Sequence, residues 1–195
     1  MILIPCLSRI TDGLISYYST QGNVRGANKT EVIMNDATYD GAAQFIGRRN
    51  GLLEGGLGQL TDGDVGGNAF WYDLGNGRSF EWVGWFDVKN ARPAILFDFD
   101  SPRKFQKIRL HGNNRPGNVK IFRNLLVAFS MDGQYFSRKF VFHPSSVMRV
   151  KRNQSMWIEV DLRGHVGKYL NCEFSYDGKW IVLSEIEFES GKNRI

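Results

Sequence analysis

The feature that most constrains the fold is a series of short apolar runs separated by turn signals, with no long amphipathic helix between them. Several runs alternate apolar and polar residues and are rich in β-branched and aromatic side chains, which is typical of strands. The predicted strands are 94–100, 105–110, 124–130, 134–142, 156–162, 168–174 and 180–188. The predicted turns include 100–103, 143–146 and 162–165. Many short strands with regular turns indicate an all-β sandwich or barrel.

Residues 11–54 follow this pattern less well. LISYY and TEVIM have the composition of strands, whereas AAQFIGRRNGLLE (42–54) favours an irregular loop or a short helix. The segment 70–85 holds three of the five tryptophans beside several glycines. Aromatic residues at this density either stack on a ligand or, more commonly, cap the core at one end of a sandwich.

Length and charge limit the remaining possibilities. A chain of 195 residues, 42% of them hydrophobic, suits one ordinary domain with a packed core. The 25 Lys and Arg residues exceed the 20 Asp and Glu residues, but they are dispersed. Nucleic acid is therefore not favoured, and an anionic surface such as a glycosaminoglycan is a comparably weak option. We expect no transmembrane segment, and the start MILIPCLSRI lacks the features of a signal peptide.

Enzyme chemistry finds little support in the sequence. His111, His143 and His165 lie far apart, each beside a turn and none near a nucleophile motif, so we expect solvated turn histidines. The glycine-rich stretch GGLGQLTDGDVGG (55–67) matches neither a phosphate-binding loop nor a dinucleotide fingerprint. We therefore expect no catalytic residues.

The same glycine-rich stretch contains two aspartates, Asp62 and Asp64, two positions apart. Glycine lets the backbone approach a small ligand closely. An Asp-x-Asp step presents the carboxylate and main-chain oxygens that calcium prefers. Asp and Gly are also common residues of surface turns. From these residues alone, both a calcium site and a plain turn stay open.

Cysteines and glycosylation motifs give weaker signals. Cys6 and Cys172 are too few for a disulfide framework and lack the spacing of a metal site. Asn28 and Asn153 each begin an Asn-x-Ser/Thr triplet, which would accept a glycan in the secretory pathway. Such triplets also arise often by chance.

Several blocks, taken in order, resemble one known family. They are DGLISY (12–17), MNDATYDG (34–41), GGLGQLTDG (55–63), WVGW (82–85) and WIVLSEIEF (180–188). Together they are similar to the second, discoidin-like domain of the discoidin domain receptors, which are collagen-activated receptor tyrosine kinases. The resemblance covers about residues 11–190, and the order of the blocks is more specific than any one of them.

The resemblance implies an all-β fold, a discoidin-type jelly-roll β-sandwich like that of the coagulation factor 5/8 C-type and galactose-binding-like domains. Residues 11–190 would form this domain, residues 1–10 a remnant of a preceding domain or linker, and residues 191–195 the start of a juxtamembrane linker. It also implies a Ca²⁺ site that clamps the glycine-rich loop to the last strand. The matching ligand positions are Asn35, Gln59, Asp62, Asp64, Ser184 and Glu185.

The chain departs from the family in ways that bear on function. Gly112 stands where the receptors carry the cysteine expected to pair with the counterpart of Cys172, so we expect a free buried Cys172 and a mobile Cys6. Ala37 breaks the family's glycan triplet at Asn35. The resemblance does not extend to the collagen-binding discoidin domain, the transmembrane helix or the kinase of the family, so we expect this chain to be a fragment or partial product of such a receptor.

Two functions remain from the sequence. The first is a receptor ectodomain module on the extracellular side of the plasma membrane. It would support collagen-dependent activation and cell–matrix adhesion through a neighbouring collagen-binding domain, with a receptor homodimer left open. The second is a stand-alone secreted adhesion module that binds carbohydrate, lipid headgroups or glycosaminoglycan. Exposed aromatic loop tips would favour the second function, and buried tryptophans the first.

Overall fold

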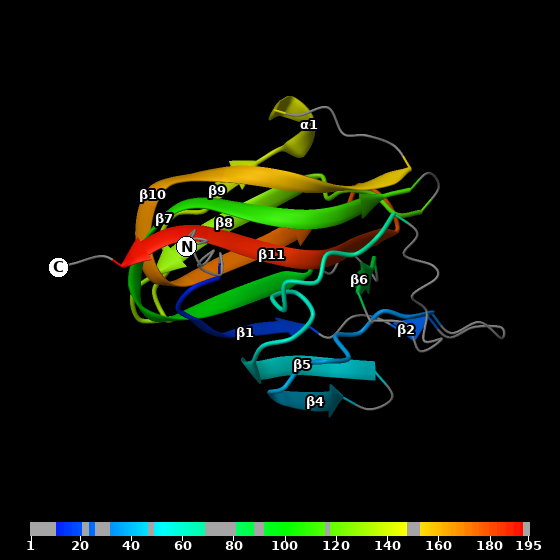
Figure 1. The fold of residues 1–195 in the computed structure, drawn as a ribbon, viewed down its shortest axis with the longest axis horizontal. Helices are drawn as coiled ribbons and strands as arrows, with labels where there is room; N and C mark the ends of the chain where they lie inside the picture. Colours follow the sequence, from blue (N-terminus) through cyan, green and yellow to red (C-terminus); the bar gives the residue numbers. More distant parts are fainter. Residues whose placement is uncertain are drawn as a thin grey trace, which may run out of the picture.

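The computed structural model shows a sandwich of antiparallel strands with a single one-turn helix among the residues it describes (Figure 1). It describes residues 11–20, 24–25, 32–46, 49–68, 81–87, 92–115, 118–147 and 153–192. The elements are β1 (Leu14–Thr20), β2 (Val24–Arg25), β3 (Val32–Ile33), β4 (Ala42–Ile46), β5 (Arg49–Gly56), β6 (Val83–Phe86), β7 (Ala94–Asn114), β8 (Asn124–Ser130), β9 (Phe140–Phe142), α1 (Pro144–Val147), β10 (Gln154–Ser175) and β11 (Trp180–Lys192).

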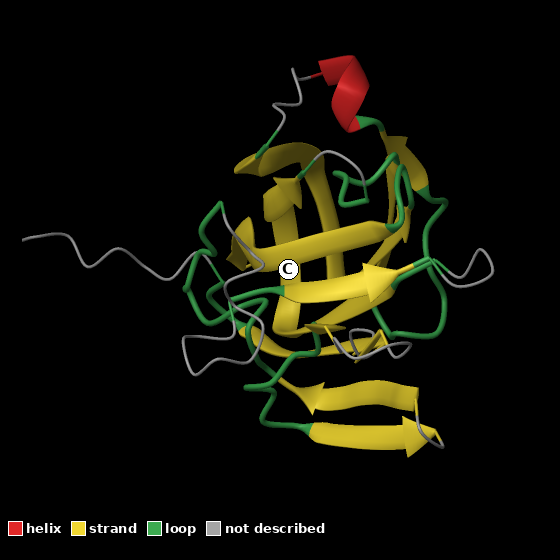
Figure 2. Ribbon diagram, turned by 90° about the vertical axis from the view of Figure 1, so that its right-hand side faces the viewer, coloured by secondary structure: helices red, strands yellow, loops and turns green. Residues whose placement is uncertain are grey.

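Two long strands, β7 and β10, belong to both layers of the sandwich. The first part of β7 pairs with β1, and its second part pairs with β11. β10 pairs with β7 along most of its length and with β8 near its end. One layer therefore has the order β4-β5-β1-β7-β10-β8-β9, and the other continues through β7 to β11 and β6. Figure 2 shows the strands stacked around the core, with the β4–β5 hairpin at one end. β2 and β3 form a separate two-stranded pair.

The turns predicted at 100–103 and 162–165 are wrong, because β7 and β10 pass through them. In β10 the pairing with β7 shifts between Asp161 and His165, and Arg163 and Gly164 have φ angles of 55° and 69°. Such a bulge bends a strand from one layer to the other while its flanks keep their hydrogen bonds. The turn predicted at 143–146 overlaps α1.

The prediction of an irregular loop or short helix at 42–54 is also wrong, because these residues form much of the β4–β5 hairpin. Leu53 is 1% exposed and Leu52 42% exposed, which is the alternation of a half-buried strand. Nearby glycines weaken the strand signal in the sequence.

The strand predicted at 134–142 is shorter than expected. Asp132 accepts the N–H groups of Gln134 and Tyr135 in a turn, and pairing resumes as β9.

The core between the layers is dominated by aromatic rings. Phe97, Phe99, Phe105 and Phe188 pack edge to face, with ring centroids 4.8–5.2 Å apart. Trp82, Trp85 and Trp180 are buried, and this agrees with the core-capping interpretation of the tryptophans in the described part of the segment 70–85. Trp71 lies outside the described residues.

Two smaller predictions concern glycan acceptors and the membrane. Asn153 is exposed directly before β10, so its accessibility suits a glycan acceptor, and glycosylation there stays a prediction. Asn28 lies outside the described residues. Within the described segments, no helix is long and apolar enough to cross a membrane.

Cys172 is a buried free thiol on β10, as predicted, where it faces the core between Ile95 and Val127 of the flanking strands. A Cβ atom at Gly112 would meet the Cδ1 atoms of Ile121 and Ile158 at 3.0 and 3.3 Å. The surroundings of Gly112 are therefore apolar and tight. Cys6 lies outside the described residues.

Burial raises the pKa of the Cys172 thiol well above its usual range, so the reactive thiolate is scarce. In a Cys6→Ser variant, we expect a thiol-specific reagent such as DTNB to leave the native chain unmodified for hours. The same reagent should label one thiol promptly in guanidinium chloride. Fast labelling of the native variant would contradict the buried position of Cys172.

Candidate metal centre

The glycine-rich loop lies across the outer face of β7 and β11, where Figure 1 shows it in teal in front of β11. Its backbone is hydrogen-bonded to the strand beneath: Ile186 N–H donates to the carbonyl of Leu60 over 2.7 Å. Further along the loop, the Asn113 side chain donates to the carbonyl of Asn68 over 3.1 Å. The loop therefore covers polar side chains that an outer sheet face would otherwise expose to water.

A β-bulge in β11 directs two adjacent residues toward this loop. The pairing of β11 with β7 shifts between Leu183 and Glu185, which leaves Ser184 as the extra residue. Gly66 N–H donates to Ser184 Oγ over 3.1 Å, and Gly63 N–H donates to Glu185 Oε2 over 3.0 Å. Both side chains are fully buried. The bulge thus places a hydroxyl and a carboxylate under the loop at consecutive positions.

Glu185 is a buried carboxylate without a cationic partner in the described structure. It is 1% exposed, and burial raises its pKa to about 9, with Asp62 and Glu187 raising it further. Burial also raises the pKa of Asp62, and the nearby Asp64 adds to this effect. Without a cation, Glu185 is therefore protonated at neutral pH, and a cation beside it would favour the ionised form.

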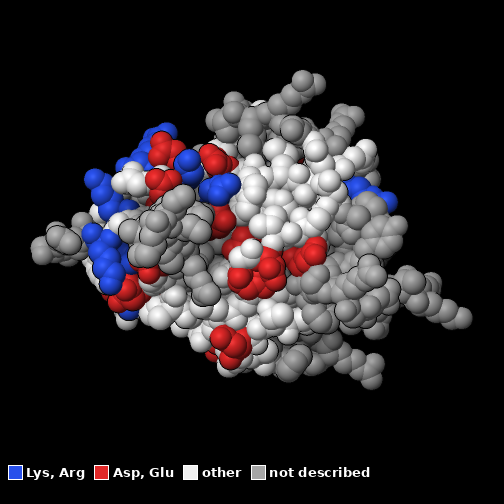
Figure 3. Space-filling model, viewed as in Figure 1, with Lys and Arg blue, Asp and Glu red and all other residues white. Residues whose placement is uncertain are grey.

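The uncovered part of the same sheet face has its charges balanced. Arg109 lies between Glu187 of β11, at 2.5 Å, and Glu159 of β10, at 3.2 Å. Lys107 also pairs with Glu159, at 3.1 Å. Figure 3 shows basic and acidic side chains interspersed toward one end of this side of the molecule. Glu185 thus differs from Glu159 and Glu187, which have cationic partners on the same face.

A second buried carboxylate, Asp36, holds the start of the loop. It accepts hydrogen bonds from Tyr17 Oη and, over 3.0 Å, from Gln59 N–H. Burial raises the pKa of Asp36, and the hydrogen bond from Tyr17 opposes this. Gln59 in turn accepts the Ala37 N–H with its Oε1, over 2.5 Å. These bonds join β1, the turn after β3 and the loop into one network.

His111 of β7 lies beneath the other end of the loop and was missed by the sequence analysis. It is 4% exposed, its Nδ1 lies 2.7 Å from Ser184 Oγ, and its ring packs between Trp82 and Trp157. Burial lowers the pKa of His111 to about 4, so the ring is neutral at pH 7. The prediction of a solvated turn histidine is wrong here, because β7 continues past His111 and the loop covers it.

Gly66 allows the loop to approach this aromatic cluster. A Cβ atom at position 66 would lie 2.3 Å from Cε2 of Trp82, which is far inside van der Waals contact. Any other residue would push the indole away from His111 or lift the loop from Ser184. This close approach is a physical reason for glycine in this part of the loop.

The structure brings together part of the predicted ligand set. Ser184 and Glu185 are hydrogen-bonded to the loop that carries Asp62 and Asp64, and Gln59 begins the same loop. Asn35 is half-buried in the turn beside Asp36. No group of three His, Cys, Asp or Glu side chains in the described segments is arranged to hold a metal ion. An ion in this region would therefore depend on amide and main-chain oxygens as well as carboxylates.

The oxygen atoms of these residues are of the kind that calcium binds. Glu185 is buried without a cationic partner in the described structure, and its ionised form is unfavourable there unless a cation neutralises it. Gln59 Oε1 accepts the Ala37 N–H and keeps a second lone pair. Carboxylate, amide and carbonyl oxygens are the donors that calcium takes at six to eight positions.

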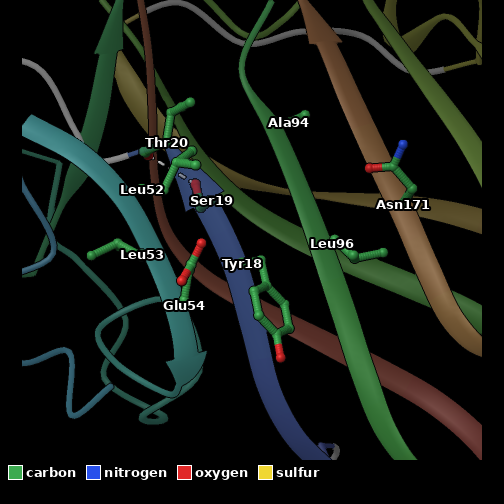
Figure 4. Close-up of a pocket in the computed structure, with 9 residues that line it drawn as sticks. All are labelled: Tyr18, Ser19, Thr20, Leu52, Leu53, Glu54, Ala94, Leu96 and Asn171. Atoms are coloured by element: carbon green, nitrogen blue, oxygen red, sulfur yellow. Dashed lines mark hydrogen bonds between the residues drawn. The ribbon is translucent and has the colours of Figure 1, made fainter. Parts of the chain in front are cut away.

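A separate depression of about 200 Å³ lies between β5, β1, β7 and β10. Figure 4 shows its lining, which includes Tyr18, Leu52, Leu96 and Asn171. None of the predicted site residues lines it. It is therefore distinct from the region under the loop.

Comparison with known proteins decides the family. Residues 13–190 match the family model of the DS-like domain of discoidin domain-containing receptors 1 and 2. The chain belongs to this family. The resemblance stated from the sequence is therefore confirmed, and with it the discoidin-type β-sandwich. The match does not test the roles predicted for residues 1–10 and 191–195.

Similar relatives include two receptors. "Epithelial discoidin domain-containing receptor 1" of Mus musculus is 33% identical over 96% of this chain and 20% of the receptor. "Discoidin domain-containing receptor tyrosine kinase B" of Caenorhabditis elegans is 28% identical over 94% of this chain and 22% of the receptor. The chain thus spans about one fifth of the length of these relatives.

Among solved structures, the lectin domain of lectinolysin complexed with Lewis B antigen is similar, with a TM-score of 0.48 and 14% identity. The alignment covers 67% of this chain and 81% of that one. The C-terminal domain of a chitobiase from Bacteroides fragilis has a TM-score of 0.45 and 16% identity, with coverage of 70% and 81%.

The raised pKa of Glu185 predicts how stability depends on pH without calcium. A carboxyl group whose folded pKa exceeds its unfolded value stabilises the fold at low pH, and this stability is lost as the pH rises toward the folded pKa. In chelator, we expect the melting temperature to fall between about pH 5 and pH 9. Glu185→Gln should remove much of this fall, whereas Glu173→Gln, at a half-exposed ion pair, should keep it. An equal slope in wild type and Glu185→Gln would contradict this prediction.

Proposed function

We propose that the chain is a calcium-stabilised, non-catalytic module in the ectodomain of a collagen-activated receptor tyrosine kinase. Membership in the DS-like family supports this proposal, as does the match to about one fifth of much longer receptors. The module lies on the extracellular side of the plasma membrane. It supports collagen-dependent activation and cell–matrix adhesion by holding a neighbouring collagen-binding domain in a defined position.

The observation that carries the calcium part is Glu185, a fully buried carboxylate beside Asp62 under the loop. The ligands are those expected from the family: Asn35, Gln59, Asp62, Asp64, Ser184 and Glu185. Ser184 Oγ already accepts the Gly66 N–H and contacts His111 Nδ1, so we assign its main-chain carbonyl to the ion. A bound calcium ion provides the cationic partner that Glu185 lacks in the described structure.

The residues of the chain do the positioning in this proposal. The network of Asp36 fixes the start of the loop to β1, and the N–H groups of Gly63 and Gly66 fix its middle to the bulge in β11. Since β11 is the last strand, the loop and the end of the domain become one rigid unit. A rigid unit of this kind suits a spacer that orients a neighbouring domain.

The adhesion alternative has one observation in its favour. Tyr135, which is 80% exposed, lies at the turn between β8 and β9, where an aromatic tip could contact a ligand. Trp82, Trp85 and Trp180 are buried and cannot stack on a sugar or insert into a membrane. Trp157, the fourth described tryptophan, is half-buried between His111 and Arg109. The three buried tryptophans therefore favour the ectodomain module.

Chelation of calcium should lower the melting temperature of the wild-type chain by about 5–10 °C. A ligand at 100 times its Kd adds about 2.7 kcal/mol, and 1 kcal/mol shifts a domain of this size by about 2–4 °C. Asp62→Ala should abolish most of this dependence, and Asp64→Ala should reduce it less, because alanine keeps the carbonyl. In chelator, Asp62→Ala should melt within a few degrees of wild type, because Asp62 is exposed and loses only the hydrogen bond from the Asp64 N–H. A wild-type melting temperature unaffected by chelation would sink the calcium proposal.

If collagen contacts belong to a neighbouring domain, the isolated chain should not bind triple-helical collagen. We expect no saturable binding to immobilised fibrillar collagen in a solid-phase assay at micromolar concentrations with calcium present. Heat-denatured collagen serves as the control for non-specific adsorption. Saturable binding to the native triple helix alone would show that this module contacts collagen directly, contrary to the proposed division of roles.

A further inference from the structure

A basic recess lies near α1, which protrudes from the sandwich at the top of Figures 1 and 2. Its cavity of about 210 Å³ is bounded by the segment 118–123, the turn 176–179 and the first residues of α1. The buried side chains of Ile121 and Phe122 form its floor. Lys120, Arg123 and Asp177 line it with their charged groups.

Lys120 is held in place at this recess. Its N–H donates to the carbonyl of Trp180 over 3.1 Å, which fixes the backbone. Its stem lies over Gly178, where a Cβ atom would come within 2.6 Å of Lys120 Cγ. Among the described residues, Lys120 has no ion-pair partner. The chain therefore presents an unbalanced ammonium group at a defined position.

Arg123 supplies a second cation that a ligand can recruit. Its backbone N–H donates to the carbonyl of Ser175 over 2.8 Å, and its Nε lies 3.3 Å from Asp177 Oδ1. The two side chains of this pair are 64% and 51% exposed, and exposed pairs contribute little to stability. Arg123 can therefore exchange Asp177 for an anionic ligand at small cost.

The chemistry of the surroundings narrows the ligand. The segments 118–123 and 176–179 carry three basic residues, Lys120, Arg123 and the exposed Lys179, against one acid, Asp177. None of the large apolar side chains found exposed in the described part of the chain lies on these segments. A lipid surface needs such side chains to insert, and single-stranded nucleic acid needs exposed rings for stacking. The charged groups of these segments are thus mainly basic, with Asp177 as their one acid.

We propose that this recess binds a sulfate group of a sulfated polysaccharide through Lys120 and Arg123. The cavity is smaller than the roughly 300–1,000 Å³ of a site for a drug-sized ligand, so it suits one charged sugar unit of a longer chain. Lys179, beside it in the turn, extends the positive surface toward the next unit. This second ligand is independent of the calcium site and of the proposed contribution to collagen-dependent activation.

The test compares two double variants of the whole chain that lose the same charge. Lys120→Gln/Arg123→Gln removes the recess, whereas Lys104→Gln/Arg163→Gln removes two exposed cations at the bends of β7 and β10. Asn114 of β7 lines the recess, and Lys104 lies ten residues before it, or about 30 Å away along an extended strand. The probe is a heparin-derived oligosaccharide, measured by calorimetry at fixed salt because such binding depends on ionic strength. We expect at least a tenfold loss of affinity for the recess variant and less than a threefold loss for the control.

A third variant tests the recess without removing a cation. Asp177→Asn removes the carboxylate that pairs with Arg123, so affinity for the oligosaccharide should rise about threefold or more. Asp161→Asn removes the same charge at a distant position and should raise the affinity less. Melting temperatures should stay within about 2 °C of wild type, because these side chains are exposed or half-exposed.

Three outcomes would overturn the proposal. Equal losses in the two double variants would mean that only net charge matters. Equal binding of a desulfated oligosaccharide would exclude recognition of the sulfate group. Tighter binding of phosphatidylserine vesicles, with the same dependence on Lys120 and Arg123, would assign the recess to a lipid phosphate. None of these results depends on calcium, so each is separable from failure of the proposed metal site.

Discussion

The fold depends on one requirement, that a loop packed on the outer face of a sheet must find partners for its own polar groups and for those it covers. The Gly63 N–H donates a hydrogen bond to Glu185, and the Gly66 N–H donates one to Ser184. The Gln59 N–H donates to Asp36. These acceptors come from β11 and from the turn after β3, far away in sequence. Because unpaired buried polar groups are costly, the loop, the turn and the last strand can be buried only together.

This requirement also explains why polar side chains gather under the loop. His111 is neutral, contacts Ser184 and lies between two indole rings, so it completes the hydrogen bonding under the loop. Glu185 receives one main-chain N–H, and burial together with the charge of Asp62 raises its pKa, so a cation nearby would favour its ionised form. Arg109, two residues before His111 on β7, is already engaged by Glu159 and Glu187. Within the described structure, Glu185 therefore has no cationic partner.

The sequence predicted the fold class and the loop correctly, because strand periodicity and family motifs are local signals. It failed where partners from distant strands decide the outcome. Residues 100–103 and 162–165 have the composition of turns, but pairing on both sides keeps β7 and β10 extended through them. His111 follows Lys107 and Arg109 in the alternation of an outer sheet face, and only the crossing loop buries it. The bulge at Ser184 leaves no signal in the sequence, although the family motif marked the residue itself.

The contact between Gly66 and Trp82 restricts how this sequence can vary. With Cε2 of the indole 2.3 Å from where a Cβ would lie, a side chain at position 66 requires a smaller residue at position 82 beforehand. Gly67, whose Cβ position has no atom within 4 Å, carries no such restriction. Two neighbouring glycines are therefore under different selection. Among relatives of this chain, residue 66 should change only in lineages where residue 82 has already lost its indole, whereas residue 67 should drift freely.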